Sequence, residues 1–259
     1  DNPMIPDSPG QDVTGKTLSM QKFIETILVQ GNEHIPLLEE HYARYLSTVN
    51  RAESPSTGRP EKPPLTIQDF AQLLIASVDT AMPRAHAAAQ AAAHAGMTIP
   101  PEQHTWRCRM IYEGNGKISS ITAEPFTPRT LKTIGIIDIP TACYPLKYSD
   151  RRVFDDLRKR FPRCDEIIIT KNGFLSDGTF TNVYLRSPDN ILLTPNTHLL
   201  AGCRRERLIR DGLLHPRTLH WRDIKPGWLI GFINALNPPG QLGEFSSVQI
   251  VGLPVDSNS

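Results

Sequence analysis

Residues 166–195 read EIIITKNGFLSDGTFTNVYLRSPDNILLTP. Two short polar segments, KNG at 171–173 and SPDN at 187–190, divide this stretch into runs that are rich in β-branched and aromatic residues. Asn, Gly, Asp and Pro favour tight turns, whereas Ile, Thr, Val, Tyr and Phe favour strands. The stretch is therefore predicted to form an antiparallel meander with FLSDGTFTNVYLR at its centre.

The sequence on either side of the meander predicts both strands and helices. Upstream, TIGIIDIP (133–140) is typical of a buried strand, and DRRVFDDLRKRF (150–161) is typical of a short amphipathic helix. Downstream, Gly202 precedes a predicted helix, CRRERLIRDG (203–212), and WLIGFINAL (228–236) predicts a late strand.

The first third of the chain favours helices after one strand. KFIETILV (22–29) predicts a strand, and residues 36–51 carry apolar side chains at helical spacing. Thr66 and Asp69 have the spacing of a capping box and are expected to begin a further helix.

A proline within the predicted helix and a pair of predicted strands follow in the sequence. Pro83 is expected to break or kink the helix, so that AHAAAQAAAHA (85–95) continues as a second helix. WRCRMIYE (106–113) and ISSITAEPF (118–126) flank the turn GNGK and predict a hairpin. Helices early in the chain and strands later on favour an α+β fold in two lobes.

Composition excludes several classes of protein. The 259 residues are 39% hydrophobic and 21% charged, and a formal net charge of +1 gives no broad basic field for nucleic acid. The four cysteines form no C-x-x-C pair, which argues against a disulfide scaffold or a zinc ribbon. No apolar run has the length of a membrane span, and no leader sequence is evident. We therefore expect a soluble cytoplasmic protein that binds neither nucleic acid nor membrane.

A phosphate-loop pattern near the start is expected to be a chance match. Residues 10–17 read GQDVTGKT and satisfy G-x-x-x-x-G-K-[ST]. Such a loop must follow a buried strand, so that its backbone N–H groups converge on phosphate. The preceding DNPMIPDSP carries three prolines and does not favour a central strand. Residues 1–18 are instead expected to form a loose tail.

Three segments, taken together, resemble the fold-type IV pyridoxal-phosphate enzymes, which are the class IV aminotransferases and the aminodeoxychorismate lyases. FIETILV…PLLEEHYARYL is similar to the family's F-E-T strand and H-x-x-R-L helix, and YPLKYSDR is similar to its lysine segment. LSDGTFTNVYL…ILLTPNTHLLAGCRRERLI is similar to its E-G-S-x-S-N strand, T-P pair and L-x-G-I-T-R helix start. FINALNPPG resembles an N-A-L-x-P segment of the lyases. The matches keep their order over about residues 22–240.

The resemblance implies that pyridoxal 5'-phosphate is bound as a Schiff base to Lys147. That lysine would also move protons at the substrate α-carbon. The alternative is a surface lysine, as Lys171 in the turn KNG is expected to be. Arg151 stands where many relatives place the tyrosine that bonds the ring hydroxyl, and a salt bridge with Asp150 or Asp155 is its alternative role.

The pyridine nitrogen must stay protonated and therefore needs an anionic partner. By resemblance that partner is Asp177, although most relatives have Glu here, and Asp is one methylene shorter. The alternative is that Asp177 and Gly178 only form a turn. Thr181 and Asn182 are expected to support this loop, and Thr179 to reach the ring edge.

The cofactor phosphate needs a cation and converging N–H donors. The resemblance assigns the cation to Arg44, and the start of the helix at Gly202 favours an anion. Relatives often carry Ile-Thr where this chain has Cys203-Arg204, so Arg204 either replaces the lost hydroxyl with charge or lies on the helix surface. Asn234 and Ala235 either contact the phosphate or only end a strand.

Substrate recognition is the least defined part of the resemblance. Most relatives carry a strand and a D-R-x-x-x-x-G-D-G segment before F-E-T, and this chain shows nothing similar before Phe23. Arg107 and Arg109 lie on one face of a predicted strand and are candidates to bind a substrate carboxylate, or they are ordinary surface arginines. The histidines form no ligand pattern such as H-E-x-x-H, so no metal is predicted.

The resemblance implies a two-lobed α+β architecture similar to D-amino acid aminotransferase. We expect a small N-terminal α/β lobe over residues 19–120 and a larger C-terminal lobe over 121–259 that carries the lysine. We also expect a homodimer. The predicted function is transfer of an amino group between an amino acid and a 2-oxo acid. The alternatives are an aminodeoxychorismate lyase that releases pyruvate and 4-aminobenzoate, and a non-catalytic protein that binds the cofactor.

Overall fold

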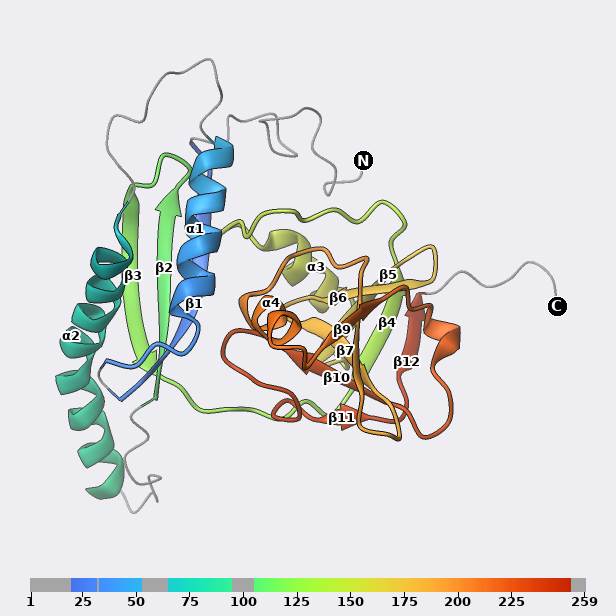
Figure 1. The fold of residues 1–259 in the computed structure, drawn as a ribbon. Coiled ribbons are helices and arrows are strands. Elements are labelled where there is room, and N and C mark those ends of the chain that lie inside the picture. The colour runs from blue at the N-terminus through green and yellow to red at the C-terminus, as the bar shows by residue number, and fades with distance from the viewer. Residues whose placement is uncertain (1–19, 32, 53–64, 95–104, 253–259) are drawn as a thin grey trace. The chain divides into compact units, whose positions relative to one another are not determined.

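A computed structural model describes residues 20–31, 33–52, 65–94 and 105–252 of the chain. These residues belong to two compact units, which are divided in the sequence between Thr127 and Pro128. Figure 1 shows the course of the chain through both. The phosphate-loop pattern and the expected tail lie outside the described residues.

The N-terminal unit contains a three-stranded antiparallel sheet and two helices. The strand order is β1-β2-β3, and β1 pairs with β2 over its whole length, from Lys22 opposite Glu113 to Gln30 opposite Thr105. The predicted first strand and the predicted hairpin are both confirmed. The elements are β1 (Lys22–Gln30), α1 (Leu38–Ala52), α2 (Ile67–His94), β2 (Thr105–Glu113) and β3 (Ile118–Pro125).

An aromatic cluster fixes both helices on the sheet of this unit. Tyr45 of α1 has its ring centroid 5.6 Å from that of Phe70 in α2 and 5.0 Å from that of Tyr112 in β2. All three side chains are fully buried. Aromatic side chains bury large apolar areas, so this cluster is a main source of stability in the unit.

The capping box is confirmed, and the expected break at Pro83 is wrong. The Asp69 N–H donates to Thr66 Oγ1 at 3.1 Å, and the Thr66 N–H donates to Asp69 Oδ2 at 3.3 Å. The helix then runs without interruption through Pro83 to His94. A proline inside a helix removes one hydrogen bond and crowds one carbonyl, and α2 tolerates this cost at an exposed position within a long helix.

The C-terminal unit is built on one mixed sheet with the strand order β11-β10-β7-β6-β5-β4-β12, which β8 and β9 extend from β7. Strands β4 and β5 are parallel and are connected through α3. The elements are β4 (Ile134–Asp138), α3 (Arg152–Arg160), β5 (Glu166–Lys171), β6 (Phe174–Gly178), β7 (Asn182–Arg186), β8 (Leu192–Pro195), α4 (Cys203–Arg210), β9 (His215–Arg217), the 3-10 helix η2 (Trp221–Asp223), β10 (Leu229–Ile233), β11 (Glu244–Phe245) and β12 (Gln249–Gly252).

The predicted meander is confirmed as β5 to β8, whose successive strands are antiparallel. Its turn KNG has positive φ angles at Asn172 (53°) and Gly173 (80°). Two successive residues with positive φ match the right-handed twist of the strands that they join. The central part of the meander is divided into β6 and β7 by a turn at residues 179–181.

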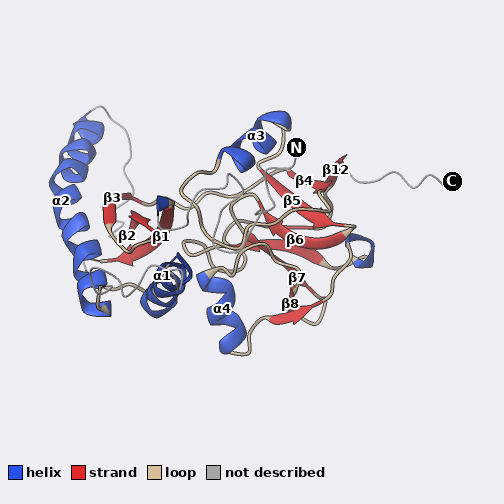
Figure 2. Ribbon diagram, turned by 90° about the horizontal axis from the view of Figure 1, so that it is seen from above, coloured by secondary structure: helices blue, strands red, loops and turns tan. Residues whose placement is uncertain are grey.

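The sheet of this unit is buried on both faces. Ile168 of β5 belongs to one hydrophobic cluster, whereas Ile167 and Ile169 belong to another that includes Phe154 and Leu157 of α3. Figure 2 shows α3 beside the strands that it covers. A strand buried on both faces has a continuous apolar run, which explains the sequence IIIT in β5. The α+β fold class is thereby confirmed.

None of the helices in the described ranges has both the length and the apolar character that a bilayer crossing requires.

Candidate active site

Most of the predicted cofactor residues belong to the C-terminal unit, where hydrogen bonds connect them. Asp177 is at the centre of this network. Its Oδ1 accepts a hydrogen bond of 2.8 Å from Asn182 Nδ2, and its Oδ2 accepts the backbone N–H groups of Leu199 at 2.8 Å and Leu200 at 2.9 Å. Burial raises the pKa of Asp177 to about 6, because the hydrogen bonds and the charge of Arg205 compensate only in part for the loss of water.

A second buried carboxylate, Glu166 at the start of β5, holds the turn between β6 and β7. Its Oε1 accepts the N–H groups of Ile167 and Thr179, both at 2.8 Å, and the Thr179 hydroxyl at 2.6 Å. Its Oε2 accepts the Thr181 hydroxyl at 2.9 Å and the N–H of Phe180 at 3.3 Å. Burial raises the pKa of Glu166 in spite of these bonds. The sequence analysis missed this residue, which no local motif marks.

Lys147 lies between β4 and α3 and is half-buried. Its segment is attached to the turn between β6 and β7 by Arg151, whose guanidinium donates to the carbonyl of Thr179 and lies 4.7 Å from the ring centroid of Phe154. Asp150, one of the two acids that were alternative partners of Arg151, accepts hydrogen bonds from the guanidinium of Arg152.

Asn182 connects Asp177 to the start of α4. In addition to its bond to Asp177, Asn182 Nδ2 donates to the carbonyl of Leu200 at 2.9 Å. Gly202 is the N-cap of α4, and a Cβ atom at this position would lie 1.9 Å from Asn182 Oδ1. Only glycine fits there. Gly202 has no side chain with which to cap α4, and the first residue of the helix, Cys203, is buried.

Arg204 links α4 to the turn at residues 234–237. Its Nε donates to the carbonyl of Asn234 at 2.9 Å, and its Nη2 donates to the carbonyl of Ala235 at 2.8 Å. Asn234 Nδ2 lies 3.5 Å from the carbonyl oxygen of Phe180, at the limit of a hydrogen bond. The network thus returns to the turn between β6 and β7. Arg204 is half-buried, so it is not the surface arginine that was one of its two expected roles.

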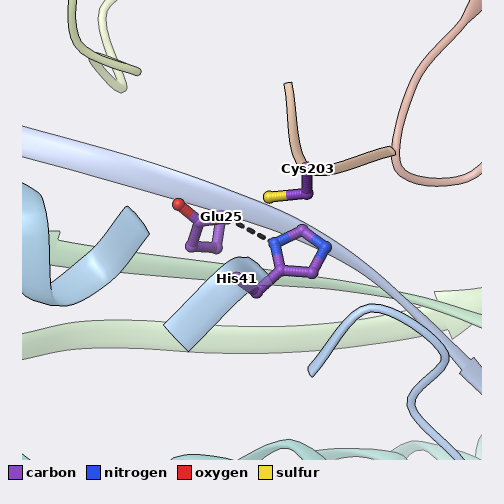
Figure 3. Close-up of side chains that lie close together, drawn as sticks. All are labelled: Glu25, His41 and Cys203. Carbon is purple, nitrogen blue, oxygen red and sulfur yellow. Dashed lines mark hydrogen bonds and ion pairs between the residues drawn. The ribbon is translucent and has the colours of Figure 1, made fainter. Parts of the chain in front are cut away.

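The remaining predicted residues belong to the N-terminal unit. Arg44 Nε donates to Glu25 Oε1 at 2.8 Å, and His41 Nδ1 lies 2.6 Å from Glu25 Oε2 (Figure 3). Burial raises the pKa of Glu25, but the charge of Arg44 and hydrogen bonds from His41 and Arg44 outweigh it and lower this pKa to about 2. Arg107 forms an ion pair with Glu124.

Arg109 is exposed, and it lies two residues from Arg107 on the same face of β2. Both arginines therefore stay candidates for a substrate carboxylate, with Arg107 already paired to an acid of its own unit.

Comparisons with known proteins give one relative by sequence and several by structure. No family model matches the sequence. Over 141 residues, 54% of this chain and 73% of the relative, the chain is 33% identical to an uncharacterized protein of Haemophilus influenzae.

Three solved structures have a similar fold. A candidate 4-amino-4-deoxychorismate lyase from Haemophilus somnus has a TM-score of 0.62 at 23% identity, covering 84% of this chain and 97% of its own. A pyridoxal-phosphate-bound form of a hypothetical aminotransferase from Mycobacterium tuberculosis has a TM-score of 0.59 at 16% identity, and the match covers 90% of this chain and 82% of that one. A fold IV transaminase from Curtobacterium pusillum has a TM-score of 0.57 at 16% identity, and the match covers 92% of this chain and 82% of that one.

At these identities the structural likeness establishes the fold, and the relative from Haemophilus influenzae establishes the family. The resemblance found in the sequence motifs is confirmed at the level of the fold. The chain belongs to the same family as the Haemophilus influenzae protein, and its fold is that of the fold-type IV transaminases and 4-amino-4-deoxychorismate lyases.

Proposed function

We propose that the protein is a pyridoxal-phosphate-dependent aminotransferase of class IV, which moves an amino group between an amino acid and a 2-oxo acid. The observation that carries this proposal is the hydrogen-bonded network of the C-terminal unit. It connects the segment of Lys147 to Asp177, the start of α4 and the turn at 234–237. Segments far apart in the sequence are thereby held in one place, as a cofactor site requires.

Asp177 suits the pyridine nitrogen better than Glu166 does. A carboxylate offers about four lone-pair positions to donors. Glu166 accepts five hydrogen bonds from its own chain and is saturated. Asp177 accepts three, two of them on Oδ2, so Oδ1 has room for one more donor. A protonated ring nitrogen would fill that position and offset the cost of burying the charge.

The start of α4 suits the phosphate group. Its first turn lies at the positive end of the helix dipole, which favours an anion beside the backbone N–H groups there. Gly202, Cys203 and Arg204 would contribute these groups. The carbonyls of Asn234 and Ala235 are already bonded to Arg204, so these two residues would contact the phosphate through their N–H groups. Arg44 is proposed to add the positive charge.

Each residue then has a defined task. Bound pyridoxal phosphate supplies an electron sink for the electron pair left when a proton leaves the substrate α-carbon. Lys147 would hold the cofactor through its amine and, once displaced by the substrate amine, would move the proton from the substrate α-carbon to the cofactor, so that the amino group stays behind when the 2-oxo acid leaves. Asp177 is ionised at neutral pH and keeps the ring nitrogen protonated. Thr181 and Asn182 hold the loop of Asp177, and Arg151 fixes the segment of Lys147.

A second candidate function is the elimination of pyruvate from aminodeoxychorismate. The likeness to the candidate lyase from Haemophilus somnus supports it, since this chain covers nearly the whole of that protein. Lys147 and Asp177 would serve both reactions, because both begin with loss of the α-proton. The two functions are separated by adding 2-oxo acids, since an aminotransferase needs such an acceptor and a lyase turns over without one.

The cofactor claim is tested by the visible spectrum of the purified protein, by borohydride reduction and by peptide mass mapping. We expect a yellow band and, after reduction, the cofactor mass on the peptide of Lys147. The K147A variant should lose the label, whereas K171A, which removes a turn lysine, should keep it. A protein that stays colourless and unmodified with added pyridoxal phosphate would refute the proposal. A labelled protein whose spectrum responds to no amino acid would support a non-catalytic role.

Two further properties are part of the proposal. By resemblance the enzyme is a homodimer. Size-exclusion chromatography with light scattering tests this by measuring the mass of the protein in solution. Cytoplasmic location is supported by the four cysteines, none of which forms a disulfide. Fractionation of the host cell, followed by detection of the protein in the soluble cytoplasmic fraction, tests the location.

A further inference from the structure

Glu166 is a buried acid to which the proposed chemistry assigns no task. Its side chain has no exposure to solvent. Within the described ranges, no lysine, arginine or histidine side chain forms an ion pair with it. Its carboxylate instead relies on five donors from its own chain, and three of these are backbone N–H groups. Burying an acid without a charged partner is costly, so its retention needs an explanation.

The other two donors are the hydroxyls of Thr179 and Thr181, at 2.6 and 2.9 Å from the carboxylate oxygens. A hydroxyl has one proton and two lone pairs. Both threonine hydroxyls donate to the carboxyl group, so both protons point at Glu166. The two hydroxyls can then act only as acceptors toward any further partner. Glu166 therefore determines the hydrogen-bonding character of the turn between β6 and β7.

Gly178 shows that the site is shaped for this carboxylate. A Cβ atom on Gly178 would lie 2.7 Å from Glu166 Oε2 and 2.3 Å from Thr181 Oγ1. Both distances are far below a van der Waals contact, so the space that a side chain would take is occupied by the acid and the hydroxyl. Asp177, directly before this glycine, is the residue proposed to face the cofactor ring.

We propose that Glu166 is a positioning residue for the cofactor, acting through Thr179 and Thr181. It holds the turn after Asp177 in place and presents the two threonine oxygens as acceptors to the cationic edge of the bound ring. This inference rests on the proposed function, since it concerns how the same site is organised. Glu166 itself does not touch the cofactor.

The variant E166Q tests this role with little change in shape. A carboxamide has one acceptor oxygen and one donor nitrogen, so one threonine hydroxyl must accept from it and turn its own proton away. We expect E166Q to weaken binding of pyridoxal phosphate by about tenfold, the scale of one charge-assisted hydrogen bond. Binding is measured by titrating the apoprotein and following protein fluorescence, which needs no turnover.

A double-mutant cycle shows whether Glu166 acts through the hydroxyls. In the T179V/T181V background there are no hydroxyl protons to orient, so E166Q should change the affinity by less than about twofold. In the T179S/T181S background, which keeps both hydroxyls, the full effect should return. T194V removes another buried hydroxyl of the same unit, which donates to the carbonyl of Val183, and should leave the effect of E166Q intact. Additivity of E166Q with T179V/T181V would overturn the proposal.

The outcomes remain distinct from failure of the proposed function. If the unaltered protein does not bind pyridoxal phosphate, the proposed function fails, and this inference fails with it. If it binds and the cycle is additive, only the role of Glu166 fails. If E166Q does not unfold cooperatively, E166D replaces it in the cycle, because the shorter side chain withdraws the carboxylate by one methylene. Additivity of E166D with T179V/T181V would then overturn the proposal.

Discussion

Asn182 faces Asp177 across the pair of strands β6 and β7 and donates a hydrogen bond of 2.8 Å from Nδ2 to Oδ1. The same nitrogen donates its second proton to the carbonyl of Leu200. With the N–H groups of Leu199 and Leu200 on Oδ2, the carboxylate is held from two sides before any ligand arrives. In the proposed role of Asp177 as partner of the ring nitrogen, these bonds from residues 199 and 200 fix the position of its short side chain.

Asp177→Asn should separate cofactor binding from chemistry. The amide keeps the size of the side chain but removes the charge that keeps the ring nitrogen protonated. We expect pyridoxal phosphate to remain bound, while exchange of the substrate α-proton for deuterium slows by about 100-fold, roughly the loss of one buried charge partner. Asp189→Asn, in the exposed turn SPDN, is the matched control. Exchange at the unaltered rate would contradict the role of Asp177.

The raised pKa of Asp177 predicts a pH dependence of stability without cofactor. The folded state holds the proton up to about pH 6, whereas the usual value for this group is 3.8. Stability is therefore largest below about pH 4 and falls as pH rises through about 6, by about 3 kcal/mol for this group. Urea unfolding from pH 4 to 7.5 should show this loss in the unaltered protein relative to D177N. If the free energy of unfolding changed with pH in the same way in both proteins, the raised pKa of Asp177 would be ruled out.

Glu25 predicts the opposite dependence in the N-terminal unit. Its pKa is lowered from 4.5 to about 2, so the stability that it contributes is present above pH 4.5 and is lost as pH falls toward 2. We expect about 3 kcal/mol to be lost over this window. E25Q should lose this stability at all pH values and unfold in acid with a shallower pH dependence. E33Q, which changes an exposed acid, should follow the unaltered protein.

Gly202→Ala should affect stability and cofactor affinity together. The new methyl group would lie 1.9 Å from Asn182 Oδ1, so either Asn182 or the start of α4 must move. Overpacking of this kind costs about 1–3 kcal/mol. Urea unfolding measures the cost, and the cofactor titration should show weaker binding because the start of α4 is displaced. Ala201→Ser, at the exposed neighbouring position, should change neither quantity, and unaltered affinity in G202A would argue against phosphate binding at α4.

Elements with strong local signals were predictable from the sequence. The capping box of Thr66 and Asp69 is determined by residues three apart, and the turn at Asn172 and Gly173 by two residues that tolerate positive φ. The apolar run of β5 has the length and β-branching of a buried strand. Pro83 misled because its cost is local, whereas the buried side chains of Phe70, Leu74 and Val78 hold the helix before it and the alanine-rich run after it favours helix.

The partners within the site were not predictable in the same way. Asp177 and Lys147 were found only through a family resemblance. Glu166 precedes an apolar strand, and its role arises from the pairing of β5 with β6, which brings the following turn over it. Arg204 finds its acceptors some thirty residues further along the chain, in the turn at 234–237. Such partners depend on tertiary structure and leave no periodicity to detect.

The pairing of β12 with β4 has a consequence for biosynthesis. All of the strands from β5 to β11 lie between these neighbours in the sequence, so β4 leaves the ribosome long before residues 249–252 do. Until then one edge of β4, with the sequence IGIID, has unpaired backbone N–H and C=O groups. An unpaired apolar edge is a template for association with other nascent chains. We therefore expect the yield of native protein in a cell to depend on shielding that edge until translation has passed Gly252.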